Sequence, residues 1–238
     1  MSDNPFARLH AEILSHPVKP RDDAADRLRA ASAAGQRLDA FKRSLGSRYA
    51  NCSLESFVVS EDQTIRNRQL AVLAALQSFV DELSECIRTG SGLFLYGASG
   101  TGKDHLVSSV MLAAVDRGIA VLWVNGLDVF AAGRDAISED TGEGRIFERL
   151  TIPTVLAISD PVPPMGDLTS FQRSLLQRVI DARYRQRKPT WVTINVANRD
   201  EADTRLGIQL ADRLTDGALC LCCSWPSYRL LRRWRPDG

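Results

Sequence analysis

The sequence predicts one α/β domain in which a parallel sheet lies between helices. Short, wholly apolar runs alternate along the chain with stretches of helical periodicity, as in strands that are buried on both faces and joined by crossover helices. A glycine-rich segment that ends in a lysine, Gly97 to Lys103, directly follows the first of these runs. A chain of 238 residues with 44% hydrophobic side chains can bury one substantial core and carry a small appendage.

The order of the expected elements follows from these two periodicities. Five apolar runs are expected to form strands, at residues 93–96, 120–124, 154–158, 190–196 and 219–224. Apolar residues at helical spacing predict helices over 69–87, 106–118, 127–137, 169–187 and 200–215, and Pro226 is expected to begin a short terminal helix. Leu70 and Leu76 are expected on the buried stripe of the first helix. Gly142 and Gly144 indicate a loop before the third strand.

Residues 1–50 are expected to form a helical extension ahead of a domain that spans residues 51–238. Pro17 and Pro20 separate two helical patterns, and Gly35 is a candidate break within the second. Two interpretations of the extension stay open at this point. It docks on the domain, or it presents an apolar helix face to a partner protein.

Composition restricts the compartment and the class of partner. The net charge of +1 provides no global field that would draw the protein to nucleic acid or to a membrane. No apolar run approaches the roughly 20 residues that a membrane-spanning helix needs, and the polar N-terminus lacks a signal-peptide core, so a cytoplasmic protein is expected. The five cysteines form no set of paired CxxC motifs, which indicates reduced thiols and argues against a zinc site.

The segment from residue 97 to residue 105 is the expected nucleotide site. Its glycines let the backbone approach phosphate oxygens, and its lysine supplies a positive charge at the start of a helix. The position after the lysine departs from the phosphate-loop pattern, because Asp104 stands where a Ser or Thr normally holds Mg²⁺. The expected nucleotide-binding residues are Gly97, Ala98, Ser99, Gly100, Thr101, Gly102, Lys103, Asp104 and His105.

Three segments together resemble a known family. They are Gly97-Ala-Ser-Gly-Thr-Gly-Lys-Asp-His-Leu106, Asn51-Cys-Ser-Leu-Glu-Ser-Phe57, and Leu206-Gly-Ile-Gln-Leu-Ala-Asp-Arg-Leu214 followed by Trp225-Pro-Ser-Tyr-Arg229. Over residues 49–233 they are similar to the DnaC-type bacterial helicase loaders and, less closely, to the IstB transposition ATPases. The resemblance implies an AAA+ ATPase domain that uses ATP, binds single-stranded DNA and delivers the replicative helicase through its N-terminal extension.

The resemblance also implies roles for three polar residues. Asn195 falls at the sensor-1 position, which orients the attacking water, although it could equally be a turn asparagine. Arg213 falls at the arginine-finger position, which reaches the nucleotide of a neighbouring subunit and implies a homo-oligomer. A surface ion pair with Asp212 is its structural alternative. Arg229 falls at the sensor-2 position, where it would contact phosphate within its own subunit, unless it is one more solvated arginine.

The family pattern ends the third strand in two acids, the first for Mg²⁺ and the second to polarise water. This chain has Ile158-Ser-Asp-Pro161 there. If the apolar runs are aligned, Ser159 takes the metal position and Asp160 the catalytic position; a slip by one residue makes Asp160 the metal acid. We prefer the first register. Asp104 and Ser159 are then the usual carboxylate and hydroxyl with their positions exchanged, so that Asp104, Ser159 and Asp160 are the candidate metal ligands.

Two basic clusters are candidate contacts for single-stranded DNA. One comprises Arg183, Arg185, Arg187 and Lys188, and the other comprises Arg229, Arg232, Arg233 and Arg235 around Trp234. Cations at the end of a helix also simply complement its dipole. Three functions remain in view: a helicase-loader ATPase with slow hydrolysis, an IstB-like transposition regulator, and a nucleotide-binding adaptor that does not hydrolyse ATP.

Overall fold

The computed structural model describes residues 23–138, 143–164 and 166–231. The first N-terminal helical pattern lies outside these residues, as do Trp234 and the basic residues Arg232, Arg233 and Arg235 of its cluster. The chain divides into two units, residues 1–36 and residues 37–238. Helix α2, Asp23–Leu45, runs without interruption through Gly35, so the expected break at this glycine is wrong. Within the second unit, Phe41 and Leu45 of α2 are buried in its core.

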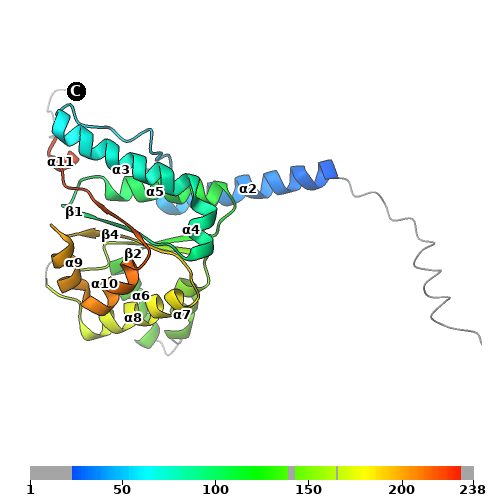
Figure 1. The fold of residues 1–238 in the computed structure, drawn as a ribbon. Coiled ribbons are helices and arrows are strands. Elements are labelled where there is room, and N and C mark those ends of the chain that lie inside the picture. Colours follow the sequence, from blue (N-terminus) through cyan, green and yellow to red (C-terminus); the bar gives the residue numbers. More distant parts are fainter. Residues whose placement is uncertain (1–22, 139–142, 165, 232–238) are drawn as a thin grey trace, which may run out of the picture. The chain divides into compact units, whose positions relative to one another are not determined.

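The second unit is built on a five-stranded sheet in which every pairing is parallel, as predicted (Figure 1). The spatial order is β2-β3-β4-β1-β5. The strands are β1 (Leu93–Gly97), β2 (Val121–Asn125), β3 (Val155–Ser159), β4 (Thr190–Asn195) and β5 (Leu219–Cys222). Each lies within a few residues of its expected run. The central position of β1 and β4 places the glycine-rich segment in the middle of the carboxyl edge.

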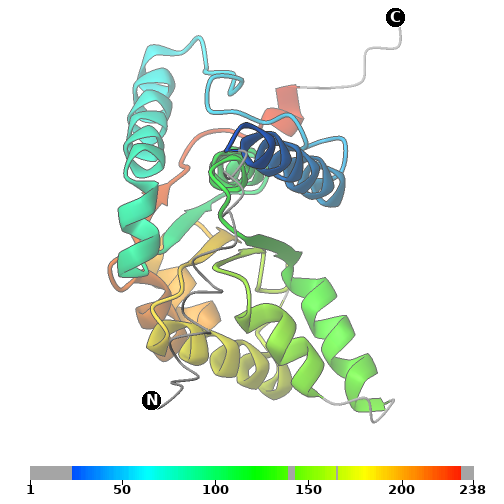
Figure 2. The same cartoon turned by 90° about the vertical axis from the view of Figure 1, so that its right-hand side faces the viewer.

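Helices cover both faces of the sheet (Figures 1 and 2), and the buried side chains form two hydrophobic clusters, one on each face. Along β1, Leu93 and Leu95 belong to one cluster and Phe94 to the other, because successive side chains of a strand point to opposite faces. The first cluster includes side chains of α3 (Gln63–Asp81), α4 (Leu83–Thr89) and α5 (Lys103–Asp116). The second includes side chains of α6 (Gly126–Ser138), α7 (Glu143–Thr151), α8 (Ser170–Arg185), α9 (Arg199–Leu206) and α10 (Ile208–Thr215). The short helix α11 (Tyr228–Leu231) follows β5.

Three details of the helices differ from the sequence prediction. The expected helix 69–87 is two helices that meet at Glu82, and the expected helix 200–215 is divided by Gly207, whose φ is 90°. The predicted buried stripe of α3 holds at Leu76 but not at Leu70, which is 48% exposed, whereas Gln69 is 1% exposed. Helix α7 occupies part of the expected loop around Gly144, and its Leu150 is buried in the second cluster.

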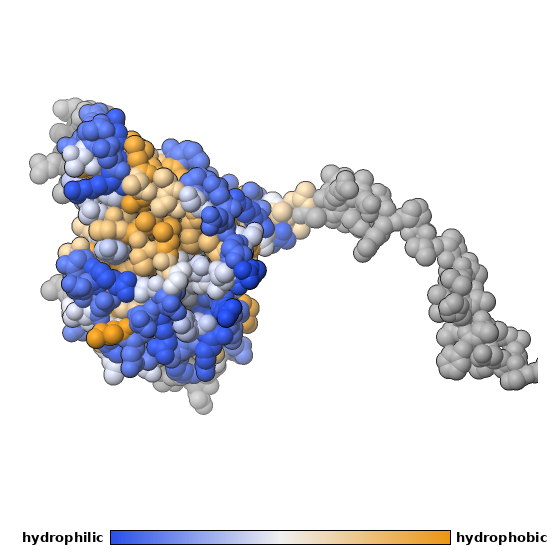
Figure 3. Space-filling view, viewed as in Figure 1, coloured by the Kyte–Doolittle hydropathy of each residue, from blue (hydrophilic) through white to orange (hydrophobic). Residues whose placement is uncertain are grey.

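Strand β5 forms one edge of the sheet, and apolar side chains gather in the middle of the face that carries it (Figure 3). Cys220 on this strand is exposed, whereas Cys52 and Cys223 are buried, and all five thiols are free. Among the described helices, none is long and apolar enough to span a membrane.

Candidate nucleotide-binding site

The glycine-rich loop connects β1 to the first turn of α5. Gly97, Gly100 and Gly102 have φ values of 146°, 83° and 93°, which side chains rarely allow. A Cβ atom on Gly97 would lie 2.4 Å from the carbonyl oxygen of Cys223, and one on Gly100 would lie 2.0 Å from the Ser227 hydroxyl. The loop therefore requires glycine at these positions. Helix α5 begins at Lys103, so its free backbone N–H groups create an anion-binding position beside the loop.

The ammonium group of Lys103 is held at the start of α5. It donates to the carbonyl oxygens of Gly97 and Ala98, at 2.9 Å each, and to Oδ1 of Asn195 at 2.7 Å. Lys103 is 5% exposed. Burial lowers the pKa of its ammonium group, while the nearby Asp160 acts in the opposite direction. The structure thus brings the loop lysine and the candidate sensor-1 residue into direct contact.

The two residues of the expected exchange, Asp104 and Ser159, are also in direct contact. The Ser159 hydroxyl donates to Oδ1 of Asp104 at 2.9 Å, and the Thr193 hydroxyl donates to the same oxygen at the same distance. Ser159 and Thr193 are neighbours on β3 and β4, and they are 3% and 1% exposed. Thr193 completes this polar group and had not been anticipated, because a threonine within an apolar central strand looks like part of the core.

Asp160 lies immediately after β3 in an unusual backbone conformation. Its φ is 47°, and its N–H donates to the carbonyl oxygen of Thr193 at 2.9 Å. Its Oδ1 atom is buried and has no hydrogen-bond partner among the described residues. Burial raises the pKa of the Asp160 carboxyl, and Asp104 raises it further, while Lys103 and Asn195 act against both. A buried oxygen of this kind, beside a lysine and an asparagine, suits a group that polarises a water molecule.

Arg229 lies at the mouth of the same site. Its Nη1 donates to the Ser99 hydroxyl at 3.4 Å, and the N–H of its neighbour Tyr228 donates to the carbonyl oxygen of Gly100 at 2.9 Å. One cavity of about 810 Å³ is lined by the loop and its lysine together with Asp104, Asp160, Asn195 and Arg229. A cavity of that size accommodates a nucleotide. Three of the expected residues outside the loop, Asp160, Asn195 and Arg229, therefore line it, and Ser159 contacts its lining residue Asp104.

His105 connects the start of α5 to the preceding segment. Its Nε2 atom lies 3.0 Å from the carbonyl oxygen of Ser53 and 3.2 Å from the Ser56 hydroxyl. Its Nδ1 atom lies 3.3 Å from the sulfur of Cys52. The ring of Phe57 meets the His105 ring edge to face at 5.6 Å. His105 therefore anchors residues 52–57 next to the loop.

Arg213 does not share this cavity. It lines a second pocket of about 510 Å³ at the amino ends of the strands, together with Arg185 and Lys188. Its Nε forms an ion pair with Asp181 at 2.9 Å. The alternative partner expected from the sequence, Asp212, is therefore replaced by Asp181.

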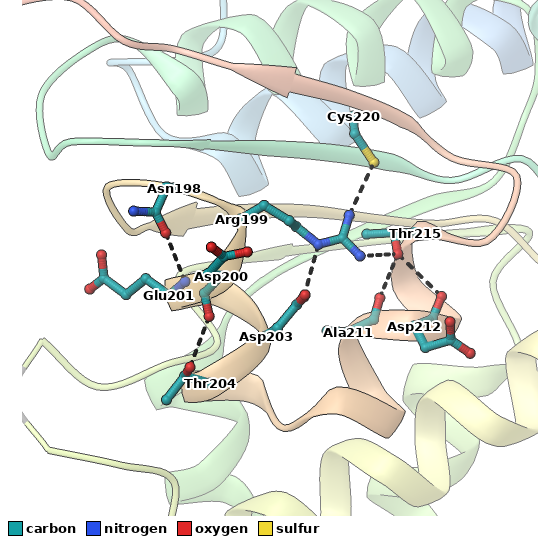
Figure 4. Close-up of polar contacts among 10 residues, drawn as sticks. All are labelled: Asn198, Arg199, Asp200, Glu201, Asp203, Thr204, Ala211, Asp212, Thr215 and Cys220. Carbon is teal, nitrogen blue, oxygen red and sulfur yellow. Dashed lines mark hydrogen bonds and ion pairs between the residues drawn. The ribbon is translucent and has the colours of Figure 1, made fainter.

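The helix that carries Arg213 is fixed by a second arginine. Arg199 donates to the carboxylate of Asp203 at 2.8 Å and to the Thr215 hydroxyl at 2.7 Å (Figure 4). Its Nη1 atom also lies 3.9 Å from the sulfur of Cys220 on β5. Arg199 therefore links α9, the end of α10 and the edge strand.

The first basic cluster is mostly structural. Arg183 is fully buried and donates to the carbonyl oxygens of Leu150, Pro153, Thr154 and Pro189 and to the Thr190 hydroxyl. Burial lowers its pKa to about 10. The ammonium group of Lys188 donates to the carbonyl oxygens of Thr151 and Ile152. Only Arg185 and Arg187 of this cluster keep the exposure that a DNA contact needs.

The donor set fits Mg²⁺ bound together with a nucleotide. Carboxylate and hydroxyl oxygens of Asp104, Ser159 and Thr193 converge beside the loop lysine, and Mg²⁺ prefers oxygen ligands, taking few from protein and the rest from phosphate and water. Among the described residues, no group of three or more His, Cys, Asp or Glu side chains could hold a metal by itself. The metal would therefore need the phosphates.

A phosphate loop on a parallel sheet with these partners defines a P-loop nucleotide-binding protein. Residues 35–235 match the family model of the IstB-like ATP binding proteins, and the chain belongs to this family. The replicative helicase loader DnaC of Escherichia coli K12 is 26% identical over 185 residues, which cover 76% of this chain and 70% of that protein. A putative insertion sequence ATP-binding protein of Sinorhizobium fredii is 27% identical over 181 residues, covering 74% and 57%.

Solved structures show that the fold is that of AAA+ P-loop NTPases. The crystal structure of the DnaC helicase loader superposes with a TM-score of 0.63 at 22% identity, over 74% of this chain and 99% of that one. The replication initiator DnaA bound to AMPPCP and single-stranded DNA gives a TM-score of 0.59 at 17% identity, over 75% and 50%. The predicted fold class is confirmed.

Proposed function

We propose that this chain is an ATP-binding helicase loader, which binds ATP with Mg²⁺ at the loop and delivers a replicative helicase to single-stranded DNA. The observation that carries the ATP-binding part is the convergence of Lys103, Asn195, Asp160 and Arg229 on one cavity. Each has the chemistry for one part of a nucleoside triphosphate: cations for the phosphates, and an amide and a carboxylate for the attacking water.

Several departures support slow or partner-stimulated hydrolysis. Asp104 brings negative charge close to the β-phosphate, where repulsion weakens binding. The family pattern has two acids at the end of β3, whereas this chain has Ser159 at the first position and only Asp160 at the second, catalytic position. Arg213 lies at the other end of the sheet and would complete the site of a neighbouring subunit only in an oligomer. These features support an ATPase that becomes active on assembly.

The loader function rests on the relatives named as DnaC, and the N-terminal extension, residues 1–50, is the segment proposed to bind the helicase. Residues 37–238 form a compact unit with Phe41 and Leu45 in its core. A truncation that removes residues 1–36 therefore keeps the core, whereas removal of 1–50 also deletes buried side chains.

The test is co-purification of the full-length chain with the replicative helicase of its host, with ATP present. We expect a complex with the full chain and none after deletion of residues 1–36. Transfer of the helicase to a single-stranded oligonucleotide should then require ATP and intact Lys103. Failure of the full chain to retain the helicase would contradict the loader function without affecting nucleotide binding.

A transposition regulator is the second candidate, because the matching family is named for IstB and one relative is an insertion sequence protein. Retention of a transposase instead of the helicase would favour it. A chain that binds ATP but releases no phosphate in the presence of DNA and partner would indicate the non-hydrolysing adaptor.

A further inference from the structure

Gln69 is a buried polar residue that no part of the proposed chemistry uses. It lies on α3 and is 1% exposed. Its amide oxygen accepts from the N–H of Ser60 at 2.7 Å, and its amide nitrogen donates to the Tyr228 hydroxyl at 2.8 Å. The Tyr228 hydroxyl in turn donates to the carbonyl oxygen of Val58 at 2.6 Å. We call these three hydrogen bonds the brace.

The brace fixes residues 57–60, which we call the wall, beside the phosphate loop. Phe57 packs against Tyr228 edge to face, with ring centroids 5.6 Å apart, and a Cβ atom on Gly102 would lie 2.8 Å from the Phe57 ring. The carbonyl oxygen of Ser60 accepts from Nε of Arg66 at 2.8 Å. The wall is thus held from α3, from α11 and by contact with the loop.

Tyr228 joins the wall to the phosphate end of the site. Its N–H donates to the carbonyl oxygen of Gly100, and the next residue is Arg229, which reaches Ser99. The wall, Tyr228 and the loop line the same cavity. If the phosphates of a ligand bind at Lys103, the remaining part of the ligand would therefore lie against the wall.

The composition of the wall suits a heterocyclic base. Phe57, Val58 and Val59 contribute apolar surface to the cavity, together with Ile65. The main-chain N–H and C=O of Val59 make no hydrogen bond to another described residue. By contrast, the brace uses the carbonyl oxygen of Val58 and the N–H of Ser60. One donor and one acceptor against an apolar surface can pair with the edge of a base, as in other nucleotide pockets.

We propose that Gln69 and Tyr228 are positioning residues that hold the wall for the base of the nucleotide, so that the base adds affinity only while the brace is intact. This inference rests on the proposed ATP binding. The side-chain hydrogen bonds of Gln69 and Tyr228 go to the wall and to each other, not to Lys103 or Asn195. The brace should therefore affect the part of the ATP affinity that a bare polyphosphate lacks.

The test compares the binding of ATP and of inorganic tripolyphosphate by calorimetry, with Mg²⁺, in the full chain. Gln69→Met keeps a buried side chain of similar length but removes both amide hydrogen bonds. Gln77→Met is the matched control, because Gln77 lies exposed on the same helix and, within the described part of the chain, its amide hydrogen-bonds only to Asp81. We expect ATP affinity to fall about tenfold in Gln69→Met, as for the loss of one to two hydrogen bonds, with tripolyphosphate affinity unchanged within about twofold.

Tyr228→Phe provides an independent variant in case Gln69→Met does not fold, since it removes only a hydroxyl. It should also weaken ATP selectively. Equal weakening of both ligands, no weakening of either, or a wild type that binds ATP no better than tripolyphosphate would overturn the brace while leaving phosphate binding in place. A wild type that binds neither ligand would overturn the proposed ATP binding, and the brace with it.

Discussion

The exchange of Asp104 and Ser159 can be tested by a double-mutant cycle. Asp104→Thr restores the usual hydroxyl after the lysine but leaves the Ser159 and Thr193 hydroxyls without the carboxylate that accepts from both at 2.9 Å. Hydrogen bonds to a charged group contribute roughly 1.5–3 kcal/mol each. Ser159→Asp alone places a second carboxylate at about that distance, where repulsion is roughly 6 kcal/mol at an effective dielectric constant of about 20.

The double mutant Asp104→Thr/Ser159→Asp again has one carboxylate and one hydroxyl, in the usual order. We expect Asp104→Thr to weaken Mg²⁺-dependent ATP binding, because loss of the pair's one carboxylate ligand outweighs the relief of its repulsion with the β-phosphate. Ser159→Asp should weaken binding through added repulsion, and the double change should recover much of the loss. The coupling free energy should be at least about 2 kcal/mol, well above the roughly 0.5 kcal/mol within which independent sites add. The assay is the ATP affinity of all four proteins, measured with Mg²⁺ and again with EDTA.

Two results would refute this reasoning. Additive effects within about 0.5 kcal/mol would show that the two residues do not serve one metal. A coupling of the same size in EDTA would show that they interact only through their direct hydrogen bond. Thermal unfolding of the four proteins separates either outcome from a loss of folding.

Three further perturbations have definite expected outcomes. Asp160→Asn should abolish partner-stimulated phosphate release yet raise the melting temperature at pH 7 by a few degrees, because burial raises the pKa of this carboxyl and a buried unsatisfied group costs roughly 1–3 kcal/mol. The folded state holds the proton of this carboxyl more tightly than the unfolded state does, so the stability gain should disappear as the pH falls below the ordinary pKa of about 4, where the carboxyl is protonated in both states. Arg183→Met should lower the free energy of unfolding by roughly 3–5 kcal/mol, because its buried carbonyl partners lose their donor; an unchanged denaturant midpoint would contradict the role assigned to Arg183. Arg213→Ala should leave ATP binding by the isolated chain within about twofold but reduce hydrolysis in the assembled state by at least roughly a hundredfold, whereas Arg185→Ala, in the same pocket, should not.

The sheet and the loop could be predicted because their signals are local. Each strand is a short apolar run, and the glycines that form the loop stand next to the lysine they serve. Hydrogen bonds between residues far apart in the sequence could not be predicted in this way. Thr193 lies 89 positions from Asp104, and nothing near Thr193 distinguishes it from the core residues that flank it.

Within α3 the prediction was wrong at one position, Leu70, for a similar reason. Apolar spacing placed Leu70 inside, but the helix buries Gln69, whose partners Ser60 and Tyr228 come from elements on either side. The burial of Arg183 was missed for the same reason. A basic residue at the end of a helix looks like a solvated cation in the sequence, but Arg183 donates to the carbonyl oxygens of Pro153 and Pro189, just before β3 and β4. Polar residues that are buried to satisfy distant groups are invisible to periodicity.

Equilibrium binding of ATP to the full chain and to Lys103→Ala tests the nucleotide site most directly. Lys103 donates to Gly97, Ala98 and Asn195 and supplies the charge that the phosphates need. We expect saturable binding of one ATP per wild-type chain, and at least about tenfold weaker binding in Lys103→Ala, equivalent to roughly 1.4 kcal/mol or more, with the fold intact by circular dichroism. Equal affinities of the two proteins for ATP would contradict the assignment of the glycine-rich loop as the nucleotide site.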